Sequence, residues 1–289
     1  MRPLSPSMTA IGVAALRALY TRMPAPLGFV RDPFAARLLP RPLGALTAAV
    51  RGRPAVASVV HHALRLATRE LSLSSPLRTL AIDDSLRDSI AAGARQLVVL
   101  GSGLDARGWR CAELSTVSVF EVDRARTLAY KRRRMAGMHS LAARHVYVPM
   151  DFARDDLARV LKDAGFQPEI PTVWLWEGVI IYLHRDAIAS TIRSVAELSA
   201  SGSRLIATYT CPGLGIARGP TLHLRLGARL IGEAVHGEIS TRALHALLES
   251  HGLVADHDDP VNAWASRVAP LADRMSGPQW ERVLVASKR

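Results

Sequence analysis

The stretch Leu97-Val-Val-Leu-Gly-Ser-Gly-Leu-Asp-Ala-Arg107 decides the fold of this chain of 289 residues. It begins as a compact apolar run, passes through a turn with glycine at positions 101 and 103, and enters a helical stretch. Glycine lets the main chain approach a ligand closely, and the helix that follows offers free N–H groups. A dinucleotide would require a third glycine in this turn, whereas Asp105 and Arg107 intervene. The turn therefore favours a cofactor with positively charged groups over a pyrophosphate.

The rest of the chain alternates apolar runs with helical segments. The further runs predicted as strands are 118–122, 145–148, 173–176, 205–209, 253–255 and 282–286, and helical segments at 124–137, 152–164 and 187–198 lie between the earlier ones. Strands that are apolar on both faces and alternate with helices form a parallel sheet that is covered on both sides. The sequence therefore predicts a doubly wound α/β domain.

The first part of the chain has a different pattern, which predicts a cap of short helices over residues 1–92 and a core over 93–289. Apolar positions recur at spacings of three and four, as expected for helices. Prolines such as Pro24, Pro54 and Pro76 divide this part into short pieces. The helical segments predicted here are 11–19, 55–66 and 80–90.

A segment after the fifth predicted strand interrupts the alternation. Glycine and proline gather near 212–220, and an amphipathic stretch follows at 222–231. We expect this insertion, at about 211–238, to form a lid over the ligand edge of the sheet.

Composition and charge exclude several classes of protein. Apolar residues make up 49% of the chain, which excludes a disordered polymer. A net charge of +12 would suit a nucleic-acid binder, but only three of the 37 basic residues are lysines and the arginines are spread along the whole chain. No aromatic residues interleave with the one basic cluster, 131–134, as a stacking platform would require. We therefore expect no nucleic acid as a partner.

The sequence also predicts the setting in which the protein works. No uncharged apolar run approaches the ~20 residues of a membrane span, and Arg17 and Arg22 interrupt the segment that most resembles a signal peptide. Cys111 and Cys211 provide no disulfide framework, and the histidines show no spacing typical of a metal site. We expect a cytoplasmic protein with no membrane partner and no metal.

Acidic residues follow the predicted strands at the edge where open α/β sheets bind ligands. Asp123 ends the second strand, where a carboxylate can accept both ribose hydroxyls of a nucleoside. Asp151 and Phe152 follow the third strand and combine an acceptor for an adenine amino group with an aromatic ring, and Glu177 follows the fourth. A single acid in such a place is more often a solvated cap. Four consecutive strand ends with glycine or acid predict one ligand site.

Five motifs together resemble one family of enzymes. They are Arg78-Thr-x-x-Ile-Asp-Asp84, the stretch 96–107, Phe-Glu-Val-Asp123 with Lys131-Arg-Arg, Val-Pro-Met-Asp151, and Trp-Glu-Gly-Val-Ile-Ile-Tyr-Leu183. In this combination they are similar to the leucine carboxyl methyltransferase-like superfamily, whose members depend on S-adenosylmethionine and include many bacterial small-molecule methyltransferases. The resemblance covers about Asp32 to Tyr209.

The resemblance implies a class I methyltransferase fold, which is a Rossmann-like sheet of seven strands with an N-terminal helical cap. It implies S-adenosyl-L-methionine as the cofactor, S-adenosyl-L-homocysteine as its product, and a small-molecule substrate. It also implies that the basic cluster 131–134 is a solvated helix face. The cofactor roles that it implies are Arg78 at the carboxylate, Gly101 at the methionine moiety with Gly103 in the same turn, Asp123 at the ribose, Asp151 and Phe152 at the adenine, and Glu177 at the amino end.

Tyr20, Thr21 and Arg22 are the candidate catalytic residues. A guanidinium near a phenol favours the phenolate and lowers the pKa of the phenol, so we expect Tyr20, assisted by Arg22, to act as a base at neutral pH. The triplet is similar to that of the indole C3-methyltransferases, which form pyrroloindolines from tryptophan-derived compounds. The first hypothesis is therefore methylation of indole C3 in secondary metabolism.

Three alternatives stay open at this point. The first is an O-methyltransferase for a carboxylate or hydroxyl of a polyketide-like metabolite, in which Tyr20 and Arg22 would only position the substrate. The second is a regulatory protein that binds the cofactor without turnover. The third is a nucleic-acid methyltransferase. We expect a monomer or a homodimer.

Overall fold

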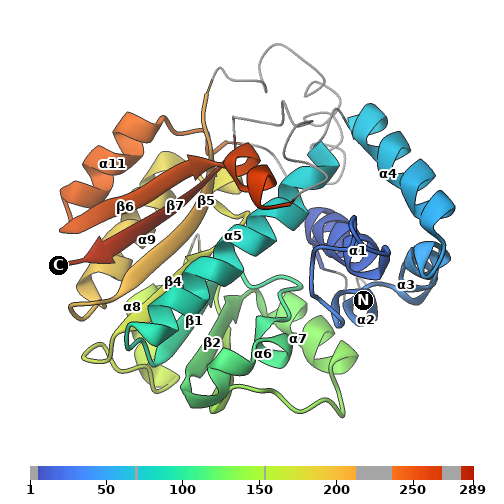
Figure 1. Ribbon diagram of the computed structural model, residues 1–289. Helices are drawn as coiled ribbons and strands as arrows, with labels where there is room; N and C mark the ends of the chain where they lie inside the picture. The colour runs from blue at the N-terminus through green and yellow to red at the C-terminus, as the bar shows by residue number, and fades with distance from the viewer. Residues whose placement is uncertain (1–5, 69–70, 153, 213–235, 269–280) are drawn as a thin grey trace.

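A computed structural model describes residues 6–68, 71–152, 154–212, 236–268 and 281–289 (Figure 1). It contains a seven-stranded sheet with the order β3-β2-β1-β4-β5-β7-β6. Each strand lies on one of the predicted apolar runs, so the predicted α/β fold is confirmed. The strands are β1 (Gln96–Leu100), β2 (Ser118–Asp123), β3 (Arg144–Pro149), β4 (Thr172–Trp176), β5 (Arg204–Thr210), β6 (Leu253–Pro260) and β7 (Glu281–Lys288).

The sheet is parallel except at β7. Strands β1 to β5 pair in parallel, whereas β7 lies antiparallel between β5 and β6. The alternation of strands and helices predicts the parallel pairing of β1 to β5, whereas the pattern says nothing of the direction of β7. Residues Val283 to Ala286 of β7 are all buried, as in a parallel strand, so an apolar run carries no information about strand direction.

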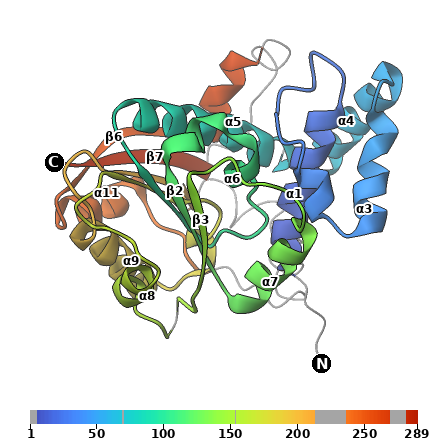
Figure 2. The same cartoon turned by 90° about the horizontal axis from the view of Figure 1, so that it is seen from below.

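Helices cover both faces of the sheet, as Figure 2 shows. On one face lies α5 (Leu71–Ala91), with the short helices η2 (Ala112–Thr116) and η4 (Val261–Arg267) beside it. On the other face lie α8 (Leu157–Asp163), α9 (Arg185–Glu197) and α11 (Thr241–Glu249). The connections between strands add α6 (Arg107–Arg110), α7 (Ala125–Arg134) and η3 (Ile180–Tyr182).

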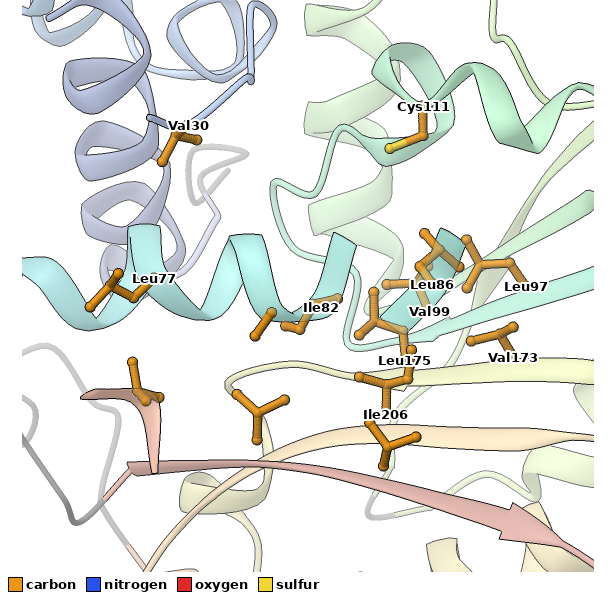
Figure 3. Packing of buried hydrophobic residues seen from close by; sticks show 14 of the residues in the cluster. Val30, Leu77, Ile82, Leu86, Leu97, Val99, Cys111, Val173, Leu175 and Ile206 are labelled. Atoms are coloured by element: carbon orange, nitrogen blue, oxygen red, sulfur yellow. The ribbon is translucent and has the colours of Figure 1, made fainter. Parts of the chain in front are cut away.

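Helix α5 packs directly on the sheet (Figure 3). Its Leu77, Ile82 and Leu86 share one buried cluster with Val99 of β1 and Leu175 of β4. The prediction that Pro76 separates two helices is wrong, because Pro76 lies inside α5. A proline within a helix costs about 3 kcal/mol. Burial of each large apolar side chain of α5 contributes about 1.5–3 kcal/mol, and together these outweigh that cost.

The remaining N-terminal helices lie beside the sheet rather than on it (Figures 1 and 2). Helix α1 packs its Ile11, Ala14 and Ala18 against Leu104 and Trp109, which follow β1. The cap therefore rests on the glycine turn. Its elements are α1 (Met8–Arg22), α2 (Ala35–Leu38), α3 (Arg41–Leu46), η1 (Thr47–Val50) and α4 (Pro54–Thr68).

The predicted domain division stays a prediction. Its boundary after residue 92 falls between α5 and β1, although α5 shares a core with the sheet. Residues 213–235 of the predicted lid at 211–238 lie outside the described part of the chain. Among the described helices, none has the length and apolar composition that crossing a bilayer requires.

Candidate cofactor site

The turn after β1 and the end of β2 form the centre of the candidate site. Gly101 has a φ of +69°, and a Cβ at this position would lie 2.4 Å from Cγ2 of Val179. The main-chain N–H of Gly103 donates to Oδ2 of Asp123 over 2.7 Å, and that of Arg124 donates to Oδ1 over 2.6 Å. These bonds orient the Asp123 carboxylate and leave acceptor capacity on each oxygen for a ligand.

Asp123 is half-buried, and burial makes the ionised form of its carboxyl group less favourable than in water. Burial raises the pKa of its carboxyl above the ordinary value, although the N–H groups of Gly103 and Arg124 oppose this effect. The ionised form is therefore short of favourable contacts. Hydroxyl groups of a ligand would supply them.

Asp151 and Phe152 lie next to Asp123, directly after β3. The N–H of Met150 donates to the carbonyl oxygen of Asp123 over 2.9 Å, which holds the two strand ends together. The N–H of Asp151 donates to Oδ2 of Asp155 over 2.8 Å, and Phe152 is half-buried. The structure thus brings these three predicted ligand residues to one edge, while their roles stay predictions.

Arg78 and Glu177 meet at the end of β4. Nε of Arg78, on α5, donates to Oε1 of Glu177 over 2.9 Å. Nη1 of Arg78 donates to Oε1 of Glu281, the first residue of β7, over 2.6 Å. Arg78 is buried and lies between these two carboxylates. The family resemblance implies that Arg78 holds the carboxylate and Glu177 the amino end of the cofactor's methionine moiety, and these two side chains are in direct contact.

Further buried ion pairs extend from Glu177 toward the cap. Nη1 of Arg107 donates to Oε2 of Glu177 over 2.9 Å, and its Nε donates to Oδ1 of Asp83 over 2.7 Å. Asp83 also accepts two bonds from Arg110, over 2.7 and 2.8 Å. Asp105 pairs with Arg107 as well. The charge of Asp105 is therefore directed at Arg107, whereas the sequence suggested that it faces a cofactor.

The ion pairs determine the protonation of these carboxyl groups. Burial alone would raise the pKa of Glu177, but Arg107 and Arg78 outweigh burial and hold the pKa below its ordinary value of 4.5. The pKa of Asp83 is lowered in the same way by Arg107 and Arg110, against the effect of burial. Both groups are therefore ionised at neutral pH.

The basic cluster 131–134 is only partly solvated. Arg132 and Arg133 are exposed, but Lys131 is completely buried, with Nζ 2.6 Å from Oε2 of Glu121 on β2. The prediction of a solvated helix face is therefore wrong for Lys131. The helical period turns one residue of this run toward the sheet, where a buried acid pairs with it.

Tyr20, Thr21 and Arg22 point to three different partners. Tyr20 is completely buried and its Oη lies 3.0 Å from Nδ1 of His61. Thr21 donates to the carbonyl oxygen of residue 17, and Arg22 donates to the carbonyl oxygen of Gly44 and to Thr47. Successive helical residues diverge by about 100° around the helix axis, which explains the separation.

The chemical argument for Tyr20 as a base does not hold in this arrangement. Burial raises the pKa of Tyr20, and the opposing effects of Ser72 and Arg65 are smaller. The prediction that Arg22 lowers this pKa is wrong, since the guanidinium of Arg22 is directed at Gly44. A catalytic role for the triplet stays a prediction.

Sequence reasoning missed three charged residues of the site. Arg107 and Asp83 lie inside the motifs that carry the family resemblance, so the sequence could have indicated that they belong to the site. Glu281 had no such signal, because it contacts Arg78 only through the placement of β7 beside β5.

The residues at this edge fit S-adenosyl-L-methionine. Arg78 offers a cation for its carboxylate, Glu177 an anion for its ammonium, and Asp123 acceptors for its ribose. The hydroxyl of Ser102, within the glycine turn, is buried and has no hydrogen-bond partner among the described residues, which leaves a donor for a ligand. Within the same part of the chain, no cluster of His, Cys, Asp and Glu side chains is arranged to hold a metal.

The sheet order, the glycine turn and the acids at the strand ends define a class I S-adenosylmethionine-dependent methyltransferase. More narrowly, the chain belongs to the leucine carboxyl methyltransferase family, whose family model matches residues 10–196. The predicted family, enzyme class and cofactor are confirmed. The alternative of a regulatory protein without turnover is set aside because this is a family of enzymes.

Relatives assigned to the S-adenosyl-L-methionine-dependent methyltransferases match much of the chain. One from Mycobacterium marinum is 36% identical over 282 residues, which cover 93% of this chain and 90% of that protein. One from Frankia alni is 38% identical over 71% of this chain and 69% of its own. One from Mycolicibacterium gilvum is 37% identical over 68% of this chain, and the match spans 64% of that protein.

Two crystal structures share the fold. A protein from Thermobifida fusca that is assigned as a methyltransferase has a TM-score of 0.64 and 16% identity, with 100% of this chain and 97% of that chain covered. A DUF574 family protein from Streptomyces avermitilis also has a TM-score of 0.64, with 12% identity and 98% of both chains covered.

Proposed function

We propose that the protein transfers a methyl group from S-adenosyl-L-methionine to a small molecule that binds between helix α1 and the carboxyl edge of the sheet. The observation that carries this proposal is that Asp123 accepts from Gly103 in the glycine turn, while the Arg78–Glu177 pair is joined by Arg107 to the segment that follows the same turn. Nη2 of Arg17, on α1, donates to the carbonyl oxygen of Leu104 over 2.7 Å, directly after that turn. The cap therefore lies against the glycine turn, where it can shape the space for the methyl acceptor.

The proposed roles of the site residues follow from their chemistry. S-adenosyl-L-methionine supplies an electrophilic methyl group on a positively charged sulfur when it is bound. Arg78 would hold its carboxylate, Glu177 its ammonium and Asp123 its ribose, while Asp151 and Phe152 would hold its adenine. By fixing the positions of cofactor and acceptor, the protein would lower the barrier by about 7–11 kcal/mol in a favourable case.

We propose a carboxylate oxygen as the methyl acceptor. A carboxylic acid has an ordinary pKa of about 4 and is ionised at neutral pH, so its methylation needs no base from the protein. This agrees with the surroundings of Tyr20, whose pKa is raised by burial, and with the direction of Arg22 toward Gly44. The family description, leucine carboxyl methyltransferase, names the same chemistry.

A second candidate is methylation of indole C3, and one contact favours it. Tyr20 and His61 are both buried, and their 3.0 Å contact joins a phenol to an imidazole. In this pair, His61 would accept the phenol proton while Tyr20 accepts the proton of the indole N–H, which makes C3 nucleophilic. A neighbouring amine or amide would then attack C2 and close a pyrroloindoline.

A panel of carboxylic acids and indoles with radiolabelled cofactor separates the two candidates. We expect labelled methyl esters, which are released by mild base, and we expect Tyr20→Phe to keep turnover within about threefold because no general base is removed. Thr21→Ser serves as a matched control for changes at the end of α1. Labelled indole products, with a loss of about 100-fold or more in Tyr20→Phe, would favour the second candidate.

The proposal includes the finer expectations from the sequence. We place the reaction in secondary metabolism and in the cytoplasm, with a monomer or homodimer as the working form and without a nucleic-acid substrate. The scattered arginines and the lack of an aromatic platform support the last of these. Salt-dependent retention of the protein on DNA or RNA would contradict it.

A further inference from the structure

Helix α4 exposes an apolar stripe. Val56, Val59 and Leu66 are exposed, the last two by 69% and 82%. Their spacings of three and seven place them on one side of the helix, with the exposed Ala63 between them. In both Figure 1 and Figure 2 this helix lies at the outer edge of the molecule, away from the sheet.

Several polar residues of α4 face the protein, whereas His62 is exposed beside the stripe. His61 is buried and contacts Tyr20, and Arg65 and Thr68 are only partly exposed. A surface helix of a globular protein ordinarily buries its apolar stripe and exposes its charges. Helix α4 buries Ala57 and packs Val60 on the core, yet it also exposes a second apolar stripe on its outward side, which suits an apolar environment.

Neighbouring elements add further exposed apolar side chains and positive charge. Leu43 and Leu46 of α3 are exposed, and five of the eight large exposed apolar side chains in the described part of the chain lie between positions 43 and 66. A hollow of about 710 Å³ next to them is lined by Pro42, Ala45, Leu46, Ala48, Ala49, Arg51 and Arg53. We call this surface the outer cap face: Leu43, Leu46, Val56, Val59 and Leu66 with Arg41, Arg51 and Arg53.

The charge around the outer cap face has one sign. Residues 6–68 contain eight arginines and one acid, Asp32. Asp32 is buried and pairs with Arg17, so it does not offset the arginines at the surface. Arg41, Arg51 and Arg53 are exposed, and none of them forms an ion pair with a described residue.

We propose that the outer cap face binds the surface of a membrane that contains anionic lipids. An apolar helix face rimmed by arginines can bury its side chains at the boundary of headgroups and acyl chains while the guanidinium groups contact phosphates. Binding at a membrane surface requires no spanning helix. The proposal departs from our expectation, drawn from the sequence, that the chain has no membrane partner.

Charge argues against a second copy of this chain as the occupant. Two outer cap faces brought together would place unpaired arginines opposite one another, and like charges across an interface cost free energy. The open hollow and the aliphatic stripe also lack the buried aromatic anchors that dominate tight protein interfaces. An anionic bilayer satisfies both the charge and the apolar surface.

Sedimentation of the full chain with lipid vesicles tests the proposal. The wild-type protein is expected to bind vesicles of phosphatidylcholine mixed with phosphatidylglycerol, to bind pure phosphatidylcholine much more weakly, and to lose affinity as salt is raised. Arg51→Gln with Arg53→Gln is expected to reduce partitioning about fivefold for each arginine, or about thirtyfold together. Val59→Ser and Leu66→Ser are each expected to reduce it about tenfold or more.

A matched control removes the same amount of positive charge from another part of the protein surface. Arg185→Gln with Arg193→Gln removes two exposed arginines from α9, on the other side of the molecule, and is expected to bind like the wild type. The proposal is overturned if the wild type binds neither vesicle, if it binds both equally, or if the control pair weakens binding as much as the Arg51 and Arg53 pair. It is also overturned if ultracentrifugation shows a dimer that Val59→Ser dissociates, because the face would then join two copies.

Discussion

Glu177→Gln is expected to lower the free energy of unfolding of the cofactor-free protein by about 3 kcal/mol at neutral pH. Glu177 accepts hydrogen bonds from both Arg78 and Arg107, and all three side chains are largely buried. Removing a buried partner leaves charge without its counter-ion, which costs more than the loss of a surface pair. Glu281 still pairs with Arg78, and Asp83 with Arg107, so the variant is expected to fold.

Urea unfolding measures this loss, and its pH dependence identifies the cause. The pKa of Glu177 is lowered below its ordinary value of 4.5, so its contribution is fully present above about pH 4.5 and is lost as the pH falls through the lowered pKa. The difference between wild type and variant should therefore shrink in acid. Glu197→Gln, at an exposed position of α9, is the control and should stay within about 0.5 kcal/mol of the wild type. An equal effect of both variants would contradict the account of the ion pairs.

Asp123→Ala is expected to weaken the binding of S-adenosyl-L-homocysteine about 100-fold. Each hydrogen bond between a ribose hydroxyl and the carboxylate contributes about 1.5 kcal/mol or more, and two such bonds correspond to this ratio. Asp123→Asn, which keeps the shape of the side chain and can accept the N–H of Gly103, is expected to lose about tenfold. Isothermal titration calorimetry measures both values.

The folding of the Asp123 variants provides the control. Because burial raises the pKa of Asp123, its ionised form costs free energy in the cofactor-free protein, and a neutral asparagine removes that cost. Asparagine keeps one acceptor oxygen, so the N–H of Arg124 loses its bond while the cost of the charge is removed; the unfolding temperature of Asp123→Asn without cofactor should therefore stay close to that of the wild type. Asp163→Asn, exposed at the end of α8, should bind like the wild type. Wild-type affinity in Asp123→Ala would show that the ribose does not lie at β2.

Local patterns were sufficient to predict the sheet and the residues at its edge. Buried strands such as β1 and β4 consist of short runs of large apolar residues, and these runs give a clear signal without any knowledge of their neighbours. The glycine turn and the acids that follow β2, β3 and β4 are adjacent to these runs in the sequence. Their meeting at one edge then follows from the geometry of parallel strands.

Features that depend on distant packing were not predictable in this way. The antiparallel direction of β7 and the contact of its Glu281 with Arg78 result from the order of strands in the sheet. Pro76 stays inside α5 because the sheet buries that helix, and Lys131 is buried because Glu121 lies opposite it. Tyr20 and Arg22 are neighbours in sequence, yet the helix directs them to His61 and Gly44.

The most direct test of the central claim is a crystal structure of the protein grown with S-adenosyl-L-homocysteine. The account predicts the ribose hydroxyls on Asp123, the amino-acid end of the cofactor against the Arg78–Glu177 pair, and the adenine beside Phe152. Density for the compound at any other place on the protein, or a vacant sheet edge in crystals saturated with it, would contradict the account.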